Sequence, residues 1–312
     1  MPLGHWFVQA PPGWLVAVFY WLGLLLLARQ VAWRWRRWSV AVGAPVAAGL
    51  ALFMGQREEP VKLTVLDLSD GVAMFVDLPG EKDDFLVDGG GGRTLLPFLR
   101  SQGVDRLGSV VVSCKDKGHV AGLGDVVGEM PVRQVVLSDT LSRSPAYWDW
   151  RALVNERRIP VRTARAGDQW HVQQLTITVL NPPDKEQFNR ADDNSLVLMF
   201  EHGPTRVLWM SDAGATVERR LAASGADLRC AVLVKGSHNK ERSGTDELLA
   251  AARPERVVQV VNAWPVNRYP EPSLWDRIET HGARWLRTDE TGAVTIHLTA
   301  HGYWVEMFRE PR

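Results

Sequence analysis

The stretch VVVSCKDKGHVAGL, residues 110–123, joins a strand to a helix through a short polar loop. Its three leading valines predict a buried strand, and the small residues after His119 favour a helix. Between the two, Cys114, Asp116 and His119 bring three kinds of metal ligand into six residues. Two lysines separate these side chains. The stretch therefore predicts a strand, a loop and a helix, and the loop is either a metal site or what is left of one.

Short strands and helices continue on both sides of this loop. Strands at hairpin spacing come first, and strands that alternate with helices follow. We expect strands at 61–68, 71–79, 84–92, 107–113, 133–139, 173–180, 194–201, 205–212, 230–236 and 256–262, and a strand pair at 293–308. We expect helices at 93–103, 119–130, 144–158, 215–224, 245–252 and 272–282. This order predicts an α/β fold in a single domain over residues 56–312, with two packed sheets that carry helices on their outer faces, a four-layer αββα sandwich.

The composition is that of a folded protein rather than a polycation that binds nucleic acid. Of the 312 residues, 46% are hydrophobic, which is enough for a substantial core. Basic and acidic residues number 36 each, but residues 1–55 contain four arginines and no acidic residue, which leaves 32 basic against 36 acidic residues in the remainder. The net charge of the remainder therefore supplies no attraction for phosphates, and the composition leaves a local basic patch open.

The first 55 residues have the pattern of a membrane anchor. Two uncharged apolar runs, at about 8–28 and 38–54, are each long enough to span the hydrocarbon core as a helix. The segment RQVAWRWRRW between them carries four arginines, and six tryptophans fall in the first forty residues. We predict a two-helix transmembrane hairpin over residues 1–55 in the inner (cytoplasmic) membrane, followed by an extracytoplasmic domain. A cleaved signal peptide and a buried helix pair of a soluble protein are the alternatives.

The two cysteines, Cys114 and Cys230, are too few for a disulfide framework. Their spacing does not match a zinc-binding cysteine pair either. They form one disulfide in an oxidising compartment or remain two buried thiols, and the sequence leaves both open.

The strand-end motifs, taken in order, resemble those of one protein family. They are LDLSDGVA (66–73), LVDGG (86–90), LLPFLRSQGV (95–104), DDNSLVL (192–198) and LRTDETGAV (286–294). The series resembles the C-terminal domain of the competence protein ComEC, which has a metallo-β-lactamase-like fold. The resemblance implies this fold, a hydrolase ancestry and an association with DNA uptake. It also implies a multi-span membrane channel protein as a partner of the hairpin, and DNA as a second partner.

The resemblance assigns the quoted loop to a metal site. The family loop reads roughly T-H-x-D-x-D-H, and Asp116 and His119 match it. Cys114 replaces the first histidine, which zinc tolerates because a thiolate is a zinc ligand. Gly118 replaces the second aspartate, and this removes a carboxylate expected to hold or orient a second metal ion.

The rest of the implied site is only partly retained. Asp212 matches the bridging aspartate of the family, and His238 is kept in the segment GSHNK, whereas Tyr269 and Glu271 stand where the family has histidines. The surviving ligands are Cys114, Asp116, His119, Asp212 and His238. They suffice for at most one ion, expected to be zinc or manganese, with Asp116 or Asp212 positioning a water that attacks a phosphodiester or an ester.

Other features of the sequence argue against a working site. Lys115 and Lys117 lie between the ligands, and an ammonium about 5 Å from a dication costs on the order of a few kcal/mol unless it points into solvent. The alternative is that the two aspartates of the set cap helices and that the loop histidine has no metal role. Asp67 and Asp88 are expected to brace turns.

The sequence thus leaves three functions open. The first is a membrane-anchored ComEC-like pseudoenzyme associated with DNA uptake, which has lost the two-metal centre and acts by binding DNA or a protein. The second is a single-metal hydrolase, either a nuclease or an esterase. The third is a remnant of a longer competence protein with no independent role.

Overall fold

The computed structural model describes residues 59–80, 82–184, 188–236, 243–262 and 272–310, together with residues 15–16, 18–20 and 23, which are helical. Within these stretches, no helix has both the length and the apolar character needed to cross a membrane. The predicted transmembrane hairpin falls almost entirely outside the described residues, so it stays a prediction.

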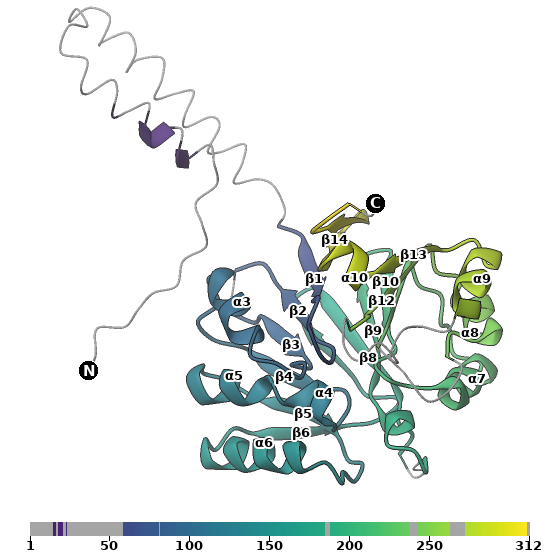
Figure 1. Cartoon of the computed structure of the whole chain (residues 1–312), viewed down its shortest axis with the longest axis horizontal. Helices are drawn as coiled ribbons and strands as arrows, with labels where there is room; N and C mark the ends of the chain where they lie inside the picture. Colours follow the sequence, from purple (N-terminus) through teal and green to yellow (C-terminus); the bar gives the residue numbers. More distant parts are fainter. Residues whose placement is uncertain are drawn as a thin grey trace, which may run out of the picture.

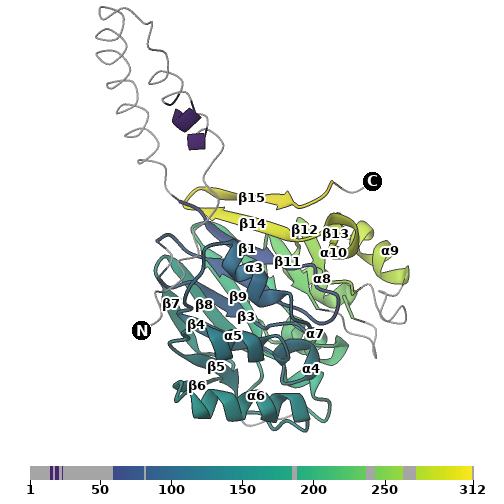
Figure 2. The same ribbon diagram turned by 60° about the vertical axis from the view of Figure 1, so that its left-hand side comes forward.

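The described strands form two sheets, one of eight strands and one of seven. The first contains β1 (Val61–Val65), β2 (Met74–Asp77), β3 (Phe85–Val87), β4 (Ser109–Val112), β5 (Val135–Ser138), β6 (Val161–Ala164), β14 (Val294–Thr299) and β15 (Gly302–Met307), in the spatial order β15-β14-β1-β2-β3-β4-β5-β6. The second contains β7 (Gln169–Val172), β8 (Leu175–Asn181), β9 (Val197–His202), β10 (Thr205–Trp209), β11 (Val232–Lys235), β12 (Arg256–Gln259) and β13 (Arg284–Arg287), in the order β13-β12-β11-β10-β9-β8-β7. Figure 2 shows β14 and β15 running together along one side of the first sheet.

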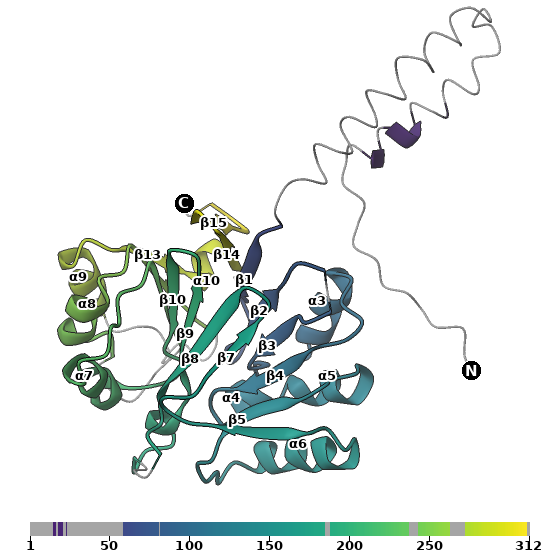
Figure 3. The same ribbon diagram turned by 180° about the vertical axis from the view of Figure 1, so that it is seen from behind.

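Helices cover the outer faces of both sheets (Figure 1). On the first sheet lie α3 (Leu95–Ser101), α4 (Lys117–Val120), α5 (Leu123–Glu129) and α6 (Pro145–Glu156). On the second lie α7 (Ala215–Ala223), α8 (Asp246–Ala252) and α9 (Pro272–Thr280). Two short helices, η1 (Asp192–Asn194) and α10 (Thr288–Thr291), lie in connections. The view from behind shows the same layers, so the described residues form the predicted four-layer αββα sandwich (Figure 3).

Three apolar clusters hold these layers together. The largest lies between the sheets, and the other two lie between each sheet and its helices. β4 illustrates the division, since Val111 faces the other sheet while Val110 and Val112 pack under the helices. The central parallel strands are therefore apolar on both faces. Examples are β4 and β5 in the first sheet and β11 in the second.

Local signals fix where two of the helices begin. α6 starts at Pro145, and its N-cap Ser144 accepts a hydrogen bond from the amide of Tyr147. α8 starts after Thr245, whose hydroxyl accepts from the amide of Leu248. Each cap satisfies an amide that would otherwise have no partner in the first turn of its helix.

Three strands of the structure were not predicted, and all three lie at sheet edges. β6 ends the first sheet, and β7 and β13 end the second. Their side chains are mostly partly or fully exposed, so their sequences lack the apolar alternation that marks a half-buried strand. The helix expected at 119–130 is also divided, into α4 and α5.

The two cysteines do not form a disulfide. Cys114 and Cys230 are both free thiols, and both are buried. Cys230 lies in the apolar cluster between the second sheet and its helices. Of the two possibilities left open by the sequence, the structure has the pair of buried thiols.

Candidate metal centre

The predicted ligands gather where parallel strands of both sheets end. Residues 113–116 follow β4, and Ser211 and Asp212 come shortly after β10. β4 is parallel to β3, and β10 is parallel to β11, so the loops after these strands lie at the same edge of their sheets. Loops at the carboxyl ends of parallel strands are the usual place for a binding site in α/β folds.

Three of the predicted ligands come together in the quoted loop. One ligand atom from each of Cys114, Asp116 and His119 lies within 4.8 Å of the others. Cys114 and His119 are buried, while Asp116 is partly exposed. Because the three atoms converge in one loop, a single cation can contact all of them.

His119, which follows a strand of the first sheet, lies next to Asp212, which follows a strand of the second sheet. Its Nδ1 lies 2.6 Å from Oδ1 of Asp116, and its Nε2 lies 3.8 Å from Oδ1 of Asp212. Nε2 is buried and has no hydrogen-bond partner among the residues that the structure describes. A metal-ligating histidine commonly has one ring nitrogen on a carboxylate and the other on the ion. His119 has Nδ1 on such a carboxylate and leaves Nε2 without a hydrogen bond.

The electrostatics of this cluster favour positive charge at its centre. Burial alone would lower the pKa of His119, but the carboxylates of Asp212, Asp88 and Asp116 raise it to about 10. Burial and the charges of Asp116 and Asp212 raise the pKa of the Cys114 thiol well above its ordinary value. Burial also opposes ionisation of Asp116, yet its hydrogen bond with His119 holds the pKa of that carboxyl below the usual value. A cation bound here would experience the same negative potential that retains the proton on His119.

Lys115 contacts residues outside the ligand set. Its ammonium donates to the carbonyl oxygen of Thr140 and lies 5.3 Å from the ring centre of Tyr147. Burial in this position lowers the pKa of Lys115 to about 8, although Asp139 acts in the opposite direction. Lys117 is exposed to solvent.

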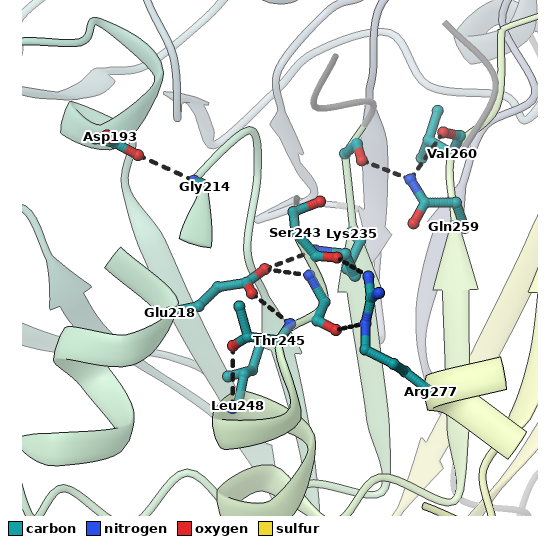
Figure 4. Close-up of polar contacts among 12 residues, drawn as sticks. Asp193, Gly214, Glu218, Lys235, Ser243, Thr245, Leu248, Gln259, Val260 and Arg277 are labelled. Carbon is teal, nitrogen blue, oxygen red and sulfur yellow. Dashed lines mark hydrogen bonds and ion pairs between the residues drawn. The ribbon is translucent and has the colours of Figure 1, made fainter. Parts of the chain in front are cut away.

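The proposed helix-capping role differs between the two aspartates. Asp116 precedes α4 as its N-cap residue, and the backbone amides of Gly118 and His119 help to hold the pKa of its carboxyl down, although no capping hydrogen bond has ideal geometry. Asp212 has no such place. The N-cap residue of α7 is Gly214, two positions after Asp212. The amide of Gly214 donates to Oδ1 of Asp193, which belongs to the segment DDNSLVL (Figure 4).

A buried hydrogen-bond network supports the ligand loop, and the sequence did not predict it. The amide of Ser113 donates to Oδ1 of Asp88 at 2.7 Å, and its hydroxyl donates to the other oxygen of that carboxylate. The hydroxyl oxygens of Ser113 and Ser211 are 2.6 Å apart. Asp88 was expected to brace a turn, and the loop that it braces is the one after β4. The available signal was that a serine immediately precedes both Cys114 and Asp212.

Two backbone features accompany this network. Asp88 and Ser211 both have positive φ, 64° and 52°, in the left-handed region that favours glycine. Burial raises the pKa of Asp88 to about 7, despite the nearby charge of His119 and the hydrogen bonds from Ser113.

The other residue expected to brace a turn, Asp67, pairs with Arg309 at 3.3 Å.

The structure does not place every predicted ligand. His238 lies outside the described residues, as do Tyr269 and Glu271. Position 118, where the resemblance implies a carboxylate, is a glycine in α4. The described ligands therefore fit one ion, through sulfur, nitrogen and carboxylate oxygen, and they lack the second carboxylate of a two-ion site.

Comparisons with solved structures agree with the two-sheet fold described above. No protein-family model matches the chain. Among solved structures, the metallo-β-lactamase-fold protein YhfI from Bacillus subtilis aligns with a TM-score of 0.52 and 12% identity, over 80% of this chain and 100% of that one. The diiron β-hydroxylase CmlA from Streptomyces venezuelae aligns with a TM-score of 0.52 and 13% identity, over 78% of this chain and 55% of that one. At these identities the likeness concerns the fold.

Two relatives relate the sequence to competence proteins. The chain is 23% identical to ComE operon protein 3 of Bacillus subtilis over 256 residues, which make up 75% of this chain and 32% of that protein. It is 27% identical to the competence protein ComA of Neisseria gonorrhoeae over 298 residues, which make up 92% of this chain and 39% of that protein. The chain is therefore similar in sequence to these competence proteins, and its fold is that of metallo-β-lactamase-fold proteins. The chain spans well under half of the length of either relative.

The resemblance in sequence and the geometry agree on the loop after β4. The loop places Cys114, Asp116 and His119 around one point, as a metallo-β-lactamase-like loop would. The two departures have different consequences. Cys114 keeps a ligand atom in place, whereas Gly118 offers none.

Proposed function

We propose that this protein is a membrane-associated ComEC-like module of a DNA-uptake system, whose site binds one zinc ion and is impaired for two-metal catalysis. The observation that carries the proposal is the convergence of Cys114, Asp116 and His119 within 4.8 Å, next to Asp212 and without a carboxylate at position 118. A thiolate and an imidazole suit zinc better than manganese, which prefers oxygen ligands.

The names of the relatives support the biological setting. ComE operon protein 3 and competence protein ComA are both named for competence. Residues 1–55, with their two apolar runs and arginine-rich segment, fit a membrane anchor that leaves the domain extracytoplasmic in the inner membrane. A multi-span channel protein is then the expected partner of that anchor, and DNA the expected ligand of the assembly.

The residues of the site have separate parts in this proposal. Cys114 and His119 would hold zinc, with Asp116 orienting the imidazole through Nδ1. A bound zinc ion supplies Lewis acidity and lowers the pKa of a water ligand to about 7. Asp212 lies beside Nε2 of His119, where its carboxylate can orient a water molecule or accept a proton from it. The glycine at position 118 leaves a second ion without the carboxylate that the family provides.

A second candidate is a single-metal hydrolase that acts on a phosphodiester or an ester. The orientation of Lys115 favours it, because the ammonium that would oppose a cation is bound to Thr140 instead. The same ligand set serves both candidates, so turnover, and not metal binding, separates them.

Metal content tests the proposal. The untagged full-length chain, purified in detergent and equilibrated with zinc or manganese, should retain about one zinc ion and little manganese. His119→Gln should lose the zinc. Asp125→Asn, which changes an exposed carboxylate on α5, is the matched control and should keep it. A chain that holds no zinc, or two ions, contradicts the proposal.

Activity assays decide between the two candidates. With single-stranded DNA and an activated phosphodiester as substrates, we expect the zinc-loaded chain to show no turnover above that of zinc alone. Zinc-dependent turnover that is abolished by Asp212→Asn would instead establish the single-metal hydrolase.

The membrane setting has its own test. The full chain should remain in the membrane fraction after an alkaline carbonate wash, and a reporter fused after residue 312 should be active outside the cytoplasm. Release by carbonate, or a reporter active in the cytoplasm, would contradict the anchored orientation.

A further inference from the structure

A fully buried ion pair lies in the second half of the domain, outside the ligand set. Nζ of Lys235 is 2.8 Å from Oε1 of Glu218, and the two side chains are 2% and 0% exposed. Glu218 is on α7, and Lys235 is the last residue of β11. A buried ion pair is commonly no more stabilising than an apolar pair of the same size, because both charges must leave water. Its presence therefore suggests that it fixes a geometry.

The pair binds the start of α8 as well as β11 (Figure 4). The amides of Gly244 and Thr245 donate to the two carboxylate oxygens of Glu218, at 2.8 and 2.7 Å. Arg277 on α9 donates to the carbonyl oxygen of Gly244 at 2.8 Å. The carboxylate is thus satisfied by one ammonium and two amides, and α7, β11 and α8 meet at this one group.

One residue connects the pair to the candidate site. Gly236 follows Lys235 directly, and its amide donates to the carbonyl oxygen of Ser211 at 2.9 Å. Its own carbonyl oxygen accepts from the side-chain amide of Gln259 at 2.6 Å (Figure 4). A Cβ atom at position 236 would overlap Oδ1 of Asp212, so the backbone of Gly236 lies directly against that carboxylate.

The two elements that the pair joins flank Asp212 on both sides. α7, which carries Glu218, begins three residues after Asp212, and β11, which carries Lys235, ends at the residue before Gly236. A change in the distance between α7 and the end of β11 would move Gly236 relative to the Asp212 carboxylate. The ion pair spans these two elements, in addition to the apolar packing between them.

We infer that Glu218 and Lys235 are positioning residues for Asp212. Their ion pair ties α7 to the end of β11 and thereby holds Gly236 against the carboxylate at the edge of the metal site. The inference rests on the proposed function only in the use of Asp212 beside a zinc ion. The claim that the ion pair holds Gly236 against the Asp212 carboxylate applies equally to the protein without metal.

The test uses the double variant Glu218→Gln/Lys235→Met in the full chain. This variant keeps the size of both side chains and removes both charges, so it should fold where a single substitution would leave one buried charge unpaired. The first readout is hydrogen–deuterium exchange of the zinc-free protein. We expect amide exchange to accelerate by about tenfold or more over residues 210–214 and at Gly236, but not in β8 and β9.

The second readout is the zinc dissociation constant, measured at a temperature at which every variant is fully folded. We expect the double variant to bind zinc about tenfold or more weakly, the range found when residues that orient metal ligands are changed. Val126→Ala, in the buried face of α5, is the control for lost stability. It should lower the melting temperature while leaving both the exchange at Gly236 and the zinc affinity unchanged.

The two readouts separate the inference from the proposed function. Wild-type exchange at residues 210–214 and Gly236 in the folded double variant would overturn the inference. Wild-type zinc affinity in that variant would overturn it as well. Failure of the wild-type chain to bind zinc would overturn the proposed function, and the exchange experiment would then decide the inference alone.

Discussion

Gly118 is the residue that most limits what the candidate site can do. An added Cβ at this position would meet Cα of Gly71 at 3.4 Å and Oδ1 of Asp116 at 3.5 Å, which are ordinary contact distances. Gly71 differs, because its φ is +77° and an added Cβ would overlap the carbonyl oxygen of Gly118. A side chain is therefore tolerated at position 118 and excluded at position 71.

This difference predicts a gain of function in Gly118→Asp. We expect the variant to fold and to bind zinc more tightly than the wild-type chain, or to take up a second ion, because it restores a carboxylate beside Asp116. Isothermal titration calorimetry measures both the affinity and the stoichiometry. Gly118→Ala is the matched control, which should fold equally well without any gain. Wild-type zinc binding in a folded Gly118→Asp variant would show that position 118 does not face the ion. An unfolded variant would contradict the tolerance of a side chain at this position.

Ser113 supports the ligand loop through Asp88, and its hydroxyl should have a measurable energetic role. We expect Ser113→Ala to lower the free energy of unfolding by about 1–3 kcal/mol, since it leaves a buried carboxylate short of a donor. Urea denaturation measures the change. Ser101→Ala removes an exposed hydroxyl from the end of α3 and should cost no more than about 0.5 kcal/mol. Equal losses in the two variants would mean that the network around Asp88 contributes nothing specific.

At the scale of elements, α7 and β11 are joined by charge in the interior of the domain. Burial opposes ionisation of Glu218, but Lys235 and the amides of Gly244 and Thr245 hold the pKa of this carboxyl below its ordinary value of 4.5. Because the folded pKa lies below the unfolded one, the stabilisation is complete above about pH 4.5. It is lost as the pH falls through the folded pKa.

The free energy of unfolding should therefore fall more steeply with decreasing pH in the wild-type chain than in Glu218→Gln/Lys235→Met. We expect the free energy of unfolding, measured in urea between about pH 5 and pH 3, to fall less in the double variant, which has no carboxyl group at position 218. Glu247→Gln removes an exposed carboxylate that pairs with Arg219 and should keep the wild-type slope. A double variant with the wild-type slope would contradict the assignment of a lowered pKa to Glu218.

Elements were predictable from the sequence in proportion to their burial. Central strands such as β4, β5 and β11 are apolar on both faces, and they stand out as short runs of valine and leucine. β7, an edge strand, alternates between exposed and partly buried side chains and carries no such run. The same limit applies to the candidate site. The sequence predicted the ligands in the loop after β4, but it did not predict the residues that hydrogen-bond to this loop and hold it in place. Ser113, Ser211 and Asp193 act through contacts between residues far apart in the sequence. A serine precedes both Cys114 and Asp212, but this local signal does not reveal which residues make contact.

At the scale of the whole molecule, the αββα sandwich was predictable because the order of its elements leaves few other arrangements. Hairpin strands followed by alternating strands and helices require two sheets, and parallel strands require covered faces. The same architecture brings the end of β4 and the end of β10 to one site, although Ser113 and Ser211 are 98 positions apart. Sequence alone could not predict that the Lys115 ammonium turns toward Thr140, because this depends on the loop that precedes α6.

The central claim is that one zinc ion binds where the two sheets meet, with sulfur from Cys114 and nitrogen from His119 among its ligands. The most direct measurement is zinc X-ray absorption spectroscopy of the untagged full-length chain loaded with one equivalent of zinc. We expect one sulfur scatterer at about 2.3 Å together with nitrogen or oxygen scatterers at about 2.0–2.2 Å, and loss of the sulfur contribution in Cys114→Ser. A spectrum without sulfur in the wild-type chain, or one that Cys114→Ser leaves unchanged, would contradict the claim.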